Sequence, residues 1–311
     1  MDQAAQGVSV IALLMVCGFV LQRTRALPAN SVAALTAVVY WATTPALLFH
    51  QLATANVREP CPARSSLLVA AASGTATALL CALAMGIARC GREDIVLGTM
   101  AGSVTNAVHI GLPIAIYVLG RGEAVAPIVI FQLAFLTPLF FTLAEWVGQA
   151  RPFSLTSFVH TLVTNPMVIA MVAGVAVGLS GIALPGLIEK STNMLGQAAP
   201  PLVLIAFGAS LVGNRLHIEA RDARAITISV LAKLVLHPLL AYAIAVLIGL
   251  SHAQVFQVCV MAALPSAQNA FIAAQRSRSG LDVARAVVAL TSVASLGVVL
   301  VIAWLMHAPA S

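Results

Sequence analysis

Long apolar stretches separated by short polar or charged connections run through the whole chain. A helix that spans a bilayer needs about 20 mostly apolar residues. Ten stretches of roughly this length lie between the charged residues. They are residues 7–21, 31–52, 65–88, 95–119, 125–143, 160–179, 187–211, 226–250, 253–275 and 283–306. The pattern predicts an all-α integral membrane protein with ten transmembrane helices. No basic segment precedes the first stretch, so it is interpreted as a helix and not as a cleaved signal.

Composition agrees with this interpretation and narrows the function classes. Hydrophobic residues make up 60% of the 311 residues, and charged residues make up 8%, against the roughly 25% typical of soluble domains. The net charge of +6 is dispersed between apolar runs, so no nucleic-acid partner is expected. The five cysteines have no paired spacing, which favours neither a disulfide framework nor a metal site.

The basic residues also predict an orientation. With the N-terminus outside, the cytoplasmic connections carry eleven Lys and Arg residues and the outer connections carry four. Such an excess is typical of cytoplasmic loops. We therefore expect both termini outside and a location in a bacterial inner membrane.

Five predicted helices lie on each side of a connection at residues 148–159, which predicts two repeats, 6–147 and 160–307. An odd number of spans per repeat makes the two halves inverted in the membrane. Proline-containing segments recur in the second and seventh helices and again in the fourth and ninth.

Helix 4 contains the first set of candidate site residues. Asn106, His109, Gly111 and Pro113 lie in the middle of its apolar stretch. Proline cannot donate a helical hydrogen bond, and glycine leaves helical geometry at low cost. The sequence predicts a break at residues 110–113, with Pro113 beginning a new half-helix.

Helix 9 contains the second set, Pro265, Ser266 and Asn269. Broken backbone at bilayer depth is tolerated where it is buried in protein or lines a cavity. Helix N-termini also attract anions. The two breaks together predict a small polar binding site at the membrane midplane. A simple proline kink in each helix is the alternative.

Lys233 is the one basic residue far inside an apolar stretch, in helix 8 and one turn before His237. An ionisable group at such depth is a candidate for function, and it could link proton movement to anion movement. The alternative is a lysine whose ammonium reaches the interface. His109 could titrate near neutral pH or remain a neutral histidine bonded within its helix.

No phosphate-binding glycine loop, zinc-ligand pair or nucleophile elbow is found in the sequence, which gives no support to ATP-driven transport or hydrolysis. We expect no enzymatic activity, no cofactor and no metal site.

Five segments together resemble the auxin efflux carrier family, whose bacterial members include malonate-transporter-like proteins. They are residues 106–120 (NAVHIGLPIAIYVLG), 165–166 (NP), 196–211 (GQAAPPLVLIAFGASL), 233–238 (KLVLHP) and 262–275 (AALPSAQNAFIAAQ).

The resemblance implies a fold related to the bile acid/sodium symporters, with two inverted five-helix repeats and crossing, broken helices 4 and 9. It implies a scaffold from helices 1, 2, 6 and 7 and a transport part from helices 3–5 and 8–10, moving as an elevator. The family's crossover prolines match Pro113 and Pro265, and its site asparagines match Asn106 and Asn269.

The expected function is secondary transport of a small organic anion, such as a mono- or dicarboxylate, driven by a proton gradient or the membrane potential. The expected partners are this anion, the lipid bilayer and a second copy bound through the scaffold helices. A sodium-coupled symporter and an anion-binding membrane sensor are the alternatives.

Overall fold

The computed structural model describes residues 2–28, 30–54, 62–149, 166–212 and 222–307, together with residues 156, 159, 163 and 164. Helices account for all the regular structure in these ranges, which confirms the all-α prediction. In the first half they are α1 (Asp2–Arg23), α2 (Ser31–Val38), η1 (Val39–Thr43), α3 (Thr44–Thr54), α4 (Pro62–Ile87), α5 (Arg92–Ser103), η2 (Ala107–Gly111), α6 (Leu112–Tyr117), η3 (Gly122–Val125), α7 (Ala126–Phe131), η4 (Gln132–Leu136) and α8 (Thr137–Gln149).

In the second half the helices are α10 (Pro166–Ser180), α11 (Gly186–Gln197), α12 (Ala199–Ser210), α13 (Ala223–Leu231), η5 (Ala232–Leu236), α14 (His237–Leu247), α15 (His252–Ala262), α16 (Asn269–Ser277) and α17 (Leu281–His307). Most of the predicted connection 148–159 and the first residues of the predicted sixth span lie outside the described residues.

Among the described residues, five helical segments are long and apolar enough to cross a membrane. They are Ser31–Thr54, Arg64–Ile87, Gly122–Gly148, Ala223–Leu247 and Leu281–Met306. Three shorter apolar helices are Ser9–Arg23, Pro166–Ser180 and His252–Ala262. The chain is therefore a multi-pass membrane protein, and the figure of ten crossings stays a prediction.

Proline positions explain four local widenings of the helices. The π-turns η1, η2, η4 and η5 each end two residues before a proline, at Pro45, Pro113, Pro138 and Pro238. A proline ring clashes with the carbonyl four residues earlier and leaves it without a donor. A widened turn accommodates the ring, and such turns occur frequently at functional sites.

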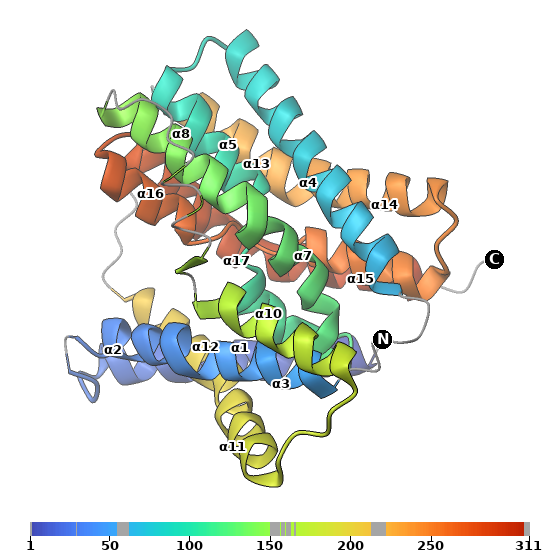
Figure 1. Ribbon diagram of the computed structural model, residues 1–311. Helices are drawn as coiled ribbons and strands as arrows, with labels where there is room; N and C mark the ends of the chain where they lie inside the picture. The colour runs from blue at the N-terminus through green and yellow to red at the C-terminus, as the bar shows by residue number, and fades with distance from the viewer. Residues whose placement is uncertain are drawn as a thin grey trace.

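The predicted seventh helix, 187–211, is wrong as a single element. Two helices, α11 and α12, meet at Ala198, directly before Pro200 and Pro201. Two successive residues without an N–H group leave the last carbonyls of α11 without helical donors. In Figure 1, α11 extends away from the neighbouring helices at the bottom of the view.

The helices form two groups (Figure 1). In the first group α1 contacts α12, and α3 contacts α10 and α11. In the second group α5 contacts α4, α8, α13 and α17, while α14 contacts α4 and α15. The groups meet where α1 contacts α6 and α12 contacts η2 and α6.

Glycines allow the close approach of helices in the first group. A Cβ at Gly18 of α1 would lie 2.0 Å from the Ile205 carbonyl oxygen of α12. A Cβ at Gly174 of α10 would lie 2.8 Å from the Phe49 carbonyl oxygen of α3. Small residues at such contacts are typical of helices packed in a membrane.

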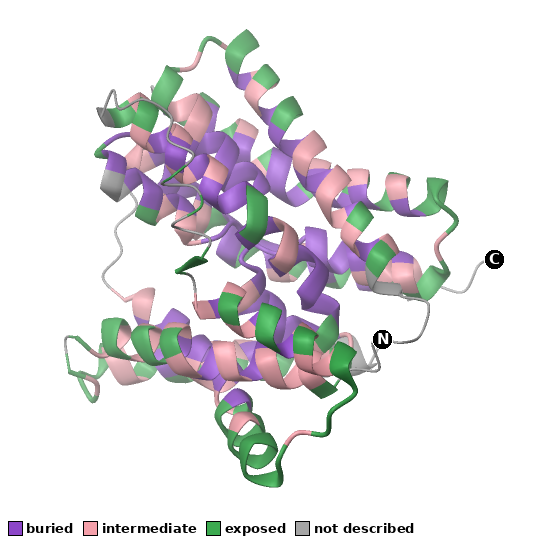
Figure 2. Ribbon diagram, viewed as in Figure 1, coloured by how far each residue is buried: buried purple, intermediate pink, exposed green. Residues whose placement is uncertain are grey.

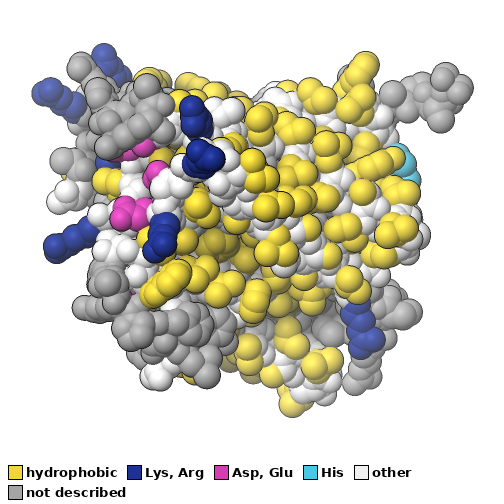
Figure 3. Space-filling model, turned by 90° about the horizontal axis from the view of Figure 1, so that it is seen from above, with side chains coloured by type: hydrophobic (Ala, Val, Ile, Leu, Met, Phe, Trp, Pro, Cys, Tyr) yellow, Lys and Arg dark blue, Asp and Glu magenta, His cyan; other side chains and the backbone are white. Residues whose placement is uncertain are grey.

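Burial is concentrated where the two groups meet and inside the second group (Figure 2). Apolar side chains cover the outside as well, including Ile87, 75% exposed, and Leu247, 85% exposed. In Figure 3 most of the visible charged side chains gather toward one end, and hydrophobic side chains cover the broad middle. A lipid-facing surface has this distribution.

Candidate functional site

The first helix break lies at Val104–Asn106, between α5 and η2. Val104 has extended backbone angles, φ −82° and ψ 125°, and a helical turn resumes at Ala107. The predicted position, residues 110–113, is therefore wrong by about two turns. The π-turn before Pro113 absorbs the proline without interrupting the helix, so Pro113 lies in the first turn of α6.

Gly111 keeps helical angles, φ −63° and ψ −39°, so it is not needed for a departure from the helix. Its small size serves a different purpose. A Cβ at this position would lie 2.7 Å from Leu264 Cδ1, in the second break. Gly111 therefore allows the two broken helices to come close together.

The second break separates α15, which ends at Ala262, from α16, which begins at Asn269. Pro265 and Ser266 lie within it, both buried. The Ser266 N–H donates to Thr291 Oγ1 of α17 at 3.0 Å, and the Ser266 hydroxyl donates to the Ala101 carbonyl of α5. The break is thus held by both neighbouring helices.

The two breaks bond to each other. The Asn106 N–H donates to the Pro265 carbonyl at 2.8 Å, and the Ala267 N–H donates to the Val104 carbonyl at 2.9 Å. These bonds form one antiparallel bridge between Thr105 and Ser266. Four of the backbone groups freed by the two interrupted helices are satisfied in this way.

Lys233 is fully buried and joins both breaks. Its ammonium donates to Thr105 Oγ1 at 2.9 Å in the first break and to the Ala262 carbonyl at 2.7 Å, at the end of α15. A third contact, 2.9 Å long, reaches His237 Nδ1 one turn along the same helix. Nζ makes all three of these contacts inside the protein, so the snorkelling alternative does not describe this lysine.

A cavity of about 280 Å³ opens beside the paired breaks. Its lining includes residues 105–108, at the start of η2, and residues 267–269, at the start of α16. Asn106 and Asn269 both line it, as predicted from their proximity to the breaks. Lys233, Gly111, Pro113, Pro265 and Ser266 are not among the lining residues. Both helix starts therefore face one cavity.

His109 lies in η2. Its side chain is outside the described part of the structure, so its place in the site stays a prediction.

The cavity contains polar residues that the sequence interpretation missed. Gln132 and Thr137, 4% and 6% exposed, contribute from η4 and the start of α8, and Tyr40 contributes from η1. The sequence did contain a signal for Gln132, because it is an amide within an apolar stretch, five residues before Thr137-Pro138. The aromatic residues that line the cavity are Tyr40 and Phe141.

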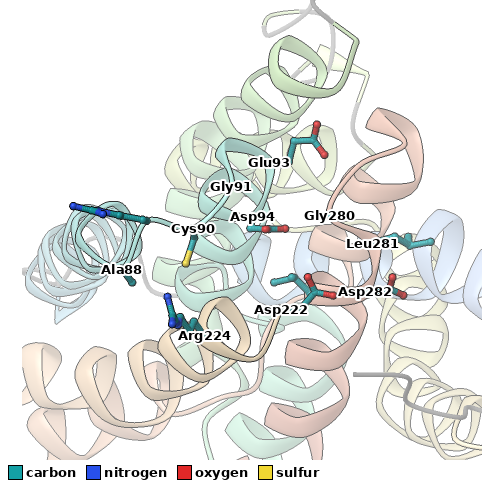
Figure 4. A pocket seen from close by; sticks show the side chains of 12 residues that line it. Ala88, Cys90, Gly91, Glu93, Asp94, Asp222, Arg224, Gly280, Leu281 and Asp282 are labelled. Carbon is teal, nitrogen blue, oxygen red and sulfur yellow. The ribbon is translucent and has the colours of Figure 1, made fainter. Parts of the chain in front are cut away.

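A larger pocket of about 590 Å³ lies away from the breaks, at the connection between α4 and α5. Figure 4 shows that its wall carries both signs of charge, with Arg224 near Cys90 and the carboxylates of Glu93, Asp94, Asp222 and Asp282 spread around it. This mixture gives no preference for one charged ligand. The cavity at the two helix starts is therefore the candidate binding site.

Comparison with known proteins agrees with this architecture. The family model described as "Membrane transport protein" matches residues 6–303. A Rhizobium meliloti (strain 1021) protein with the name "Putative malonate transporter" is 26% identical over 306 residues, which cover 96% of this chain and 94% of that protein. The chain therefore belongs to the membrane transport protein family, that of the auxin efflux carriers, and is a membrane transporter and not an enzyme.

Proposed function

We propose that this protein is a secondary carrier for a small organic anion, a mono- or dicarboxylate. The observation that carries the proposal is the cavity at which two helix starts converge. Each helix N-terminus has a partial positive charge of roughly half a unit and exposes N–H groups. The side chains of Asn106, Gln132, Gln268 and Asn269 add amide donors.

The size and sign of the cavity support a small anion. Among the described residues that line it there is no carboxylate, so a negatively charged ligand meets no like charge from them. Its volume of about 280 Å³ lies just below the roughly 300–1,000 Å³ of pockets for drug-sized ligands. The name of the Rhizobium relative points to malonate for that protein, and a short dicarboxylate fits the same cavity chemistry.

An inverted repeat is part of the proposal, and the glycine contacts of the first helix group support it. Gly18 lies against Ile205, and Gly174 lies against Phe49. Gly174 follows Gly18 by 156 residues (174 − 18), and Ile205 follows Phe49 by the same 156 (205 − 49). Two copies of one helix contact, related by a constant shift, are expected from a duplicated unit.

We extend this to ten crossings with both termini outside, in the inner membrane, and to crossing helices 4 and 9. The first helix group is the proposed scaffold and dimer contact. The second group, which contains both breaks, is the proposed moving part of an elevator mechanism. Tyr40 and Met167 of the first group line the same cavity as Asn106 and Asn269 of the second. A binding site at this boundary would be exposed by sliding one group along the other.

Proton or voltage coupling is preferred over sodium coupling because Lys233 Nζ already occupies the oxygen atoms at the paired breaks. Its ammonium is bonded to the Ala262 carbonyl and the Thr105 hydroxyl, oxygen atoms of the kind that a small cation requires. A resident ammonium competes with sodium for these oxygens.

The test uses the purified full-length protein in proteoliposomes with radiolabelled malonate, malate and an indole acid. We expect uptake of a small carboxylate that persists when choline replaces sodium. A strict sodium requirement contradicts proton coupling. Binding without flux identifies a sensor, and the absence of both binding and flux for a panel of carboxylates contradicts the proposed substrate class.

A further inference from the structure

A second, much smaller cavity lies next to His237, at the junction of α4, α7, α14 and α15. Its volume is about 20 Å³, and its lining includes Ser66, Ser73, Pro127, His237, Gln257 and Met261. A cavity needs roughly 10–15 Å³ to hold one water molecule, and that water needs two to four polar partners. We call this cavity the His237 chamber.

Two polar atoms at the chamber have no hydrogen-bond partner within the described part of the chain. They are His237 Nε2 and Ser73 Oγ, on side chains that are each 1% exposed. Buried polar atoms without a partner cost about 1–3 kcal/mol each. Ser66, about two turns from Ser73 on α4, and Gln257 on α15 add further polar groups to the lining. The site is therefore polar as well as large enough for one water.

The other ring nitrogen of His237 contacts the fully buried Lys233 at 2.9 Å. While Lys233 is an ammonium it has only donors, so Nδ1 accepts and the neutral ring carries its proton on Nε2, facing the chamber. When Lys233 is a neutral amine its lone pair accepts from Nδ1–H, and Nε2 becomes an acceptor. The charge on Lys233 is thus linked to the direction of hydrogen bonding in the chamber.

We propose that one water molecule, held in the chamber between His237 Nε2 and Ser73 Oγ, makes Lys233 and His237 a proton relay for the carrier. In the release step one proton moves from Lys233 Nζ to His237 Nδ1, the Nε2 proton passes to the chamber water, and that water gives one proton to solvent water outside the chamber. The lysine becomes a neutral amine, the histidine stays neutral, and one proton leaves the pair. Loading is the reverse sequence of transfers.

The relay reaches the substrate cavity through Thr105. The Thr105 hydroxyl accepts from Lys233, and Thr105 is one of the residues that line the 280 Å³ cavity. A change in the charge on Lys233 therefore alters the field at the anion site. This coupling rests on the carrier function proposed above, whereas the relay can be tested without transport.

Other titratable groups on the packed helices are few near this pair. Within the described spans they are the thiols of Cys81 on α4 and Cys259 on α15, and the phenol of Tyr242 on α14 itself. The other ionisable groups on these helices lie toward their ends, at Arg64 on α4, Arg92, Glu93 and Asp94 on α5, Arg224 on α13, His252 on α15, and Asp282 and Arg285 on α17. Lys233 and His237 thus form the titrating pair inside this group of helices.

The relay itself is tested by nitrogen NMR of the full-length protein in liposomes with labelled histidine. The His237 signal is identified by its loss in His237→Gln. We expect the proton on the ring to change from Nε2 to Nδ1 as the pH rises. A single protonation pattern from acid to alkaline pH overturns the relay.

Coupling is tested by carboxylate uptake driven by a pH gradient, compared with exchange of the same carboxylate at equal pH. Ser73→Ala removes a partner of the water, and Ser292→Ala removes a buried hydroxyl that donates to Val288 O within α17, remote from the lining. We expect gradient-driven uptake to fall about tenfold or more in Ser73→Ala and about 100-fold in His237→Gln, with exchange still measurable. Ser292→Ala should match the wild type.

Gradient-driven uptake that is unchanged in both chamber variants overturns the coupling. Carboxylate uptake by the wild type without proton movement does the same and leaves the carrier function intact. If the wild type moves no carboxylate, the proposed function is wrong, and the NMR measurement still decides the relay.

Discussion

The packing of α1 against α12 can be tested by adding one carbon atom. A Cβ at Gly208 would lie 1.8 Å from the Met15 carbonyl oxygen, and a Cβ at Gly18 would lie 2.0 Å from the Ile205 carbonyl oxygen. An ordinary contact begins near 3.4 Å, so each alanine forces the helices apart by more than 1 Å. Because the obstacle is backbone, rotation of a side chain cannot relieve it.

The expected cost follows from two opposing effects. Overpacking of a tight contact costs about 1–3 kcal/mol, while replacing a helical glycine by alanine returns about 0.5–1 kcal/mol. Gly208→Ala should therefore destabilise the protein by up to about 2.5 kcal/mol. Gly297→Ala is the matched control, because a Cβ there meets nothing within 4 Å. It should stabilise α17 by about 0.5–1 kcal/mol.

The assay is unfolding of the purified protein by detergent titration, followed by circular dichroism. Stability should fall in the order of the closest approach, with Gly208→Ala and Gly18→Ala lowest, then Gly174→Ala, and Gly297→Ala highest. If Gly208→Ala and Gly297→Ala unfold at the same detergent concentration, the close backbone contact between α1 and α12 does not exist.

Three further predictions concern the site and the charged end of the molecule. Lys233→Met should abolish carboxylate flux while the protein stays folded, because the Ala262 carbonyl and the Thr105 hydroxyl lose the donor between the breaks; near-normal flux removes Lys233 from the mechanism. Gln132→Leu should weaken carboxylate binding about 10–100-fold in calorimetry, the loss of one hydrogen bond to a charged group, and an unchanged affinity would exclude Gln132 from the site. Burial, followed by the Asp94 carboxylate, raises the pKa of the Cys90 thiol above its ordinary value, while Arg224 lowers it. Asp94→Asn should lower that pKa and speed alkylation of Cys90 at neutral pH, measured with the other cysteines replaced. A slower reaction would show that Asp94 does not raise the pKa of Cys90.

The sequence was sufficient to predict the helical membrane class because apolar length is a local property. It also identified Asn106 and Asn269 as residues near the breaks, since amides beside prolines in apolar stretches are visible in one dimension. The position of the first break was wrong because proline was expected to interrupt the helix. A π-turn ending at Gly111 accommodates Pro113 instead.

Contacts between distant segments could not be predicted in the same way. Gln132 enters the cavity from η4, about 26 residues after Asn106 in the chain. Its role depends on how α7 and α8 pack against the two breaks, and no local pattern encodes that packing. The splitting of α11 from α12 was in principle visible at Pro200-Pro201, because two prolines in succession rarely continue a preceding helix.

The proposed repeat leaves the chemistry of the two halves unequal, and this inequality bears on the direction of coupling. In the proposed repeat, α4 is the third predicted helix, and the segment α13–η5–α14 is the eighth and its counterpart in the second half. The first supplies the hydroxyls of Ser73 and Thr77, and the second supplies Lys233 and His237. Such a duplication would account for the two paired helix breaks that meet at the cavity. The single ammonium comes from one half only, so charge compensation of a bound anion must be controlled by the second repeat. Variants of His237 should therefore change how transport responds to proton gradients, while variants of the hydroxyls on α4 should change how readily the proton reaches the Lys233–His237 pair.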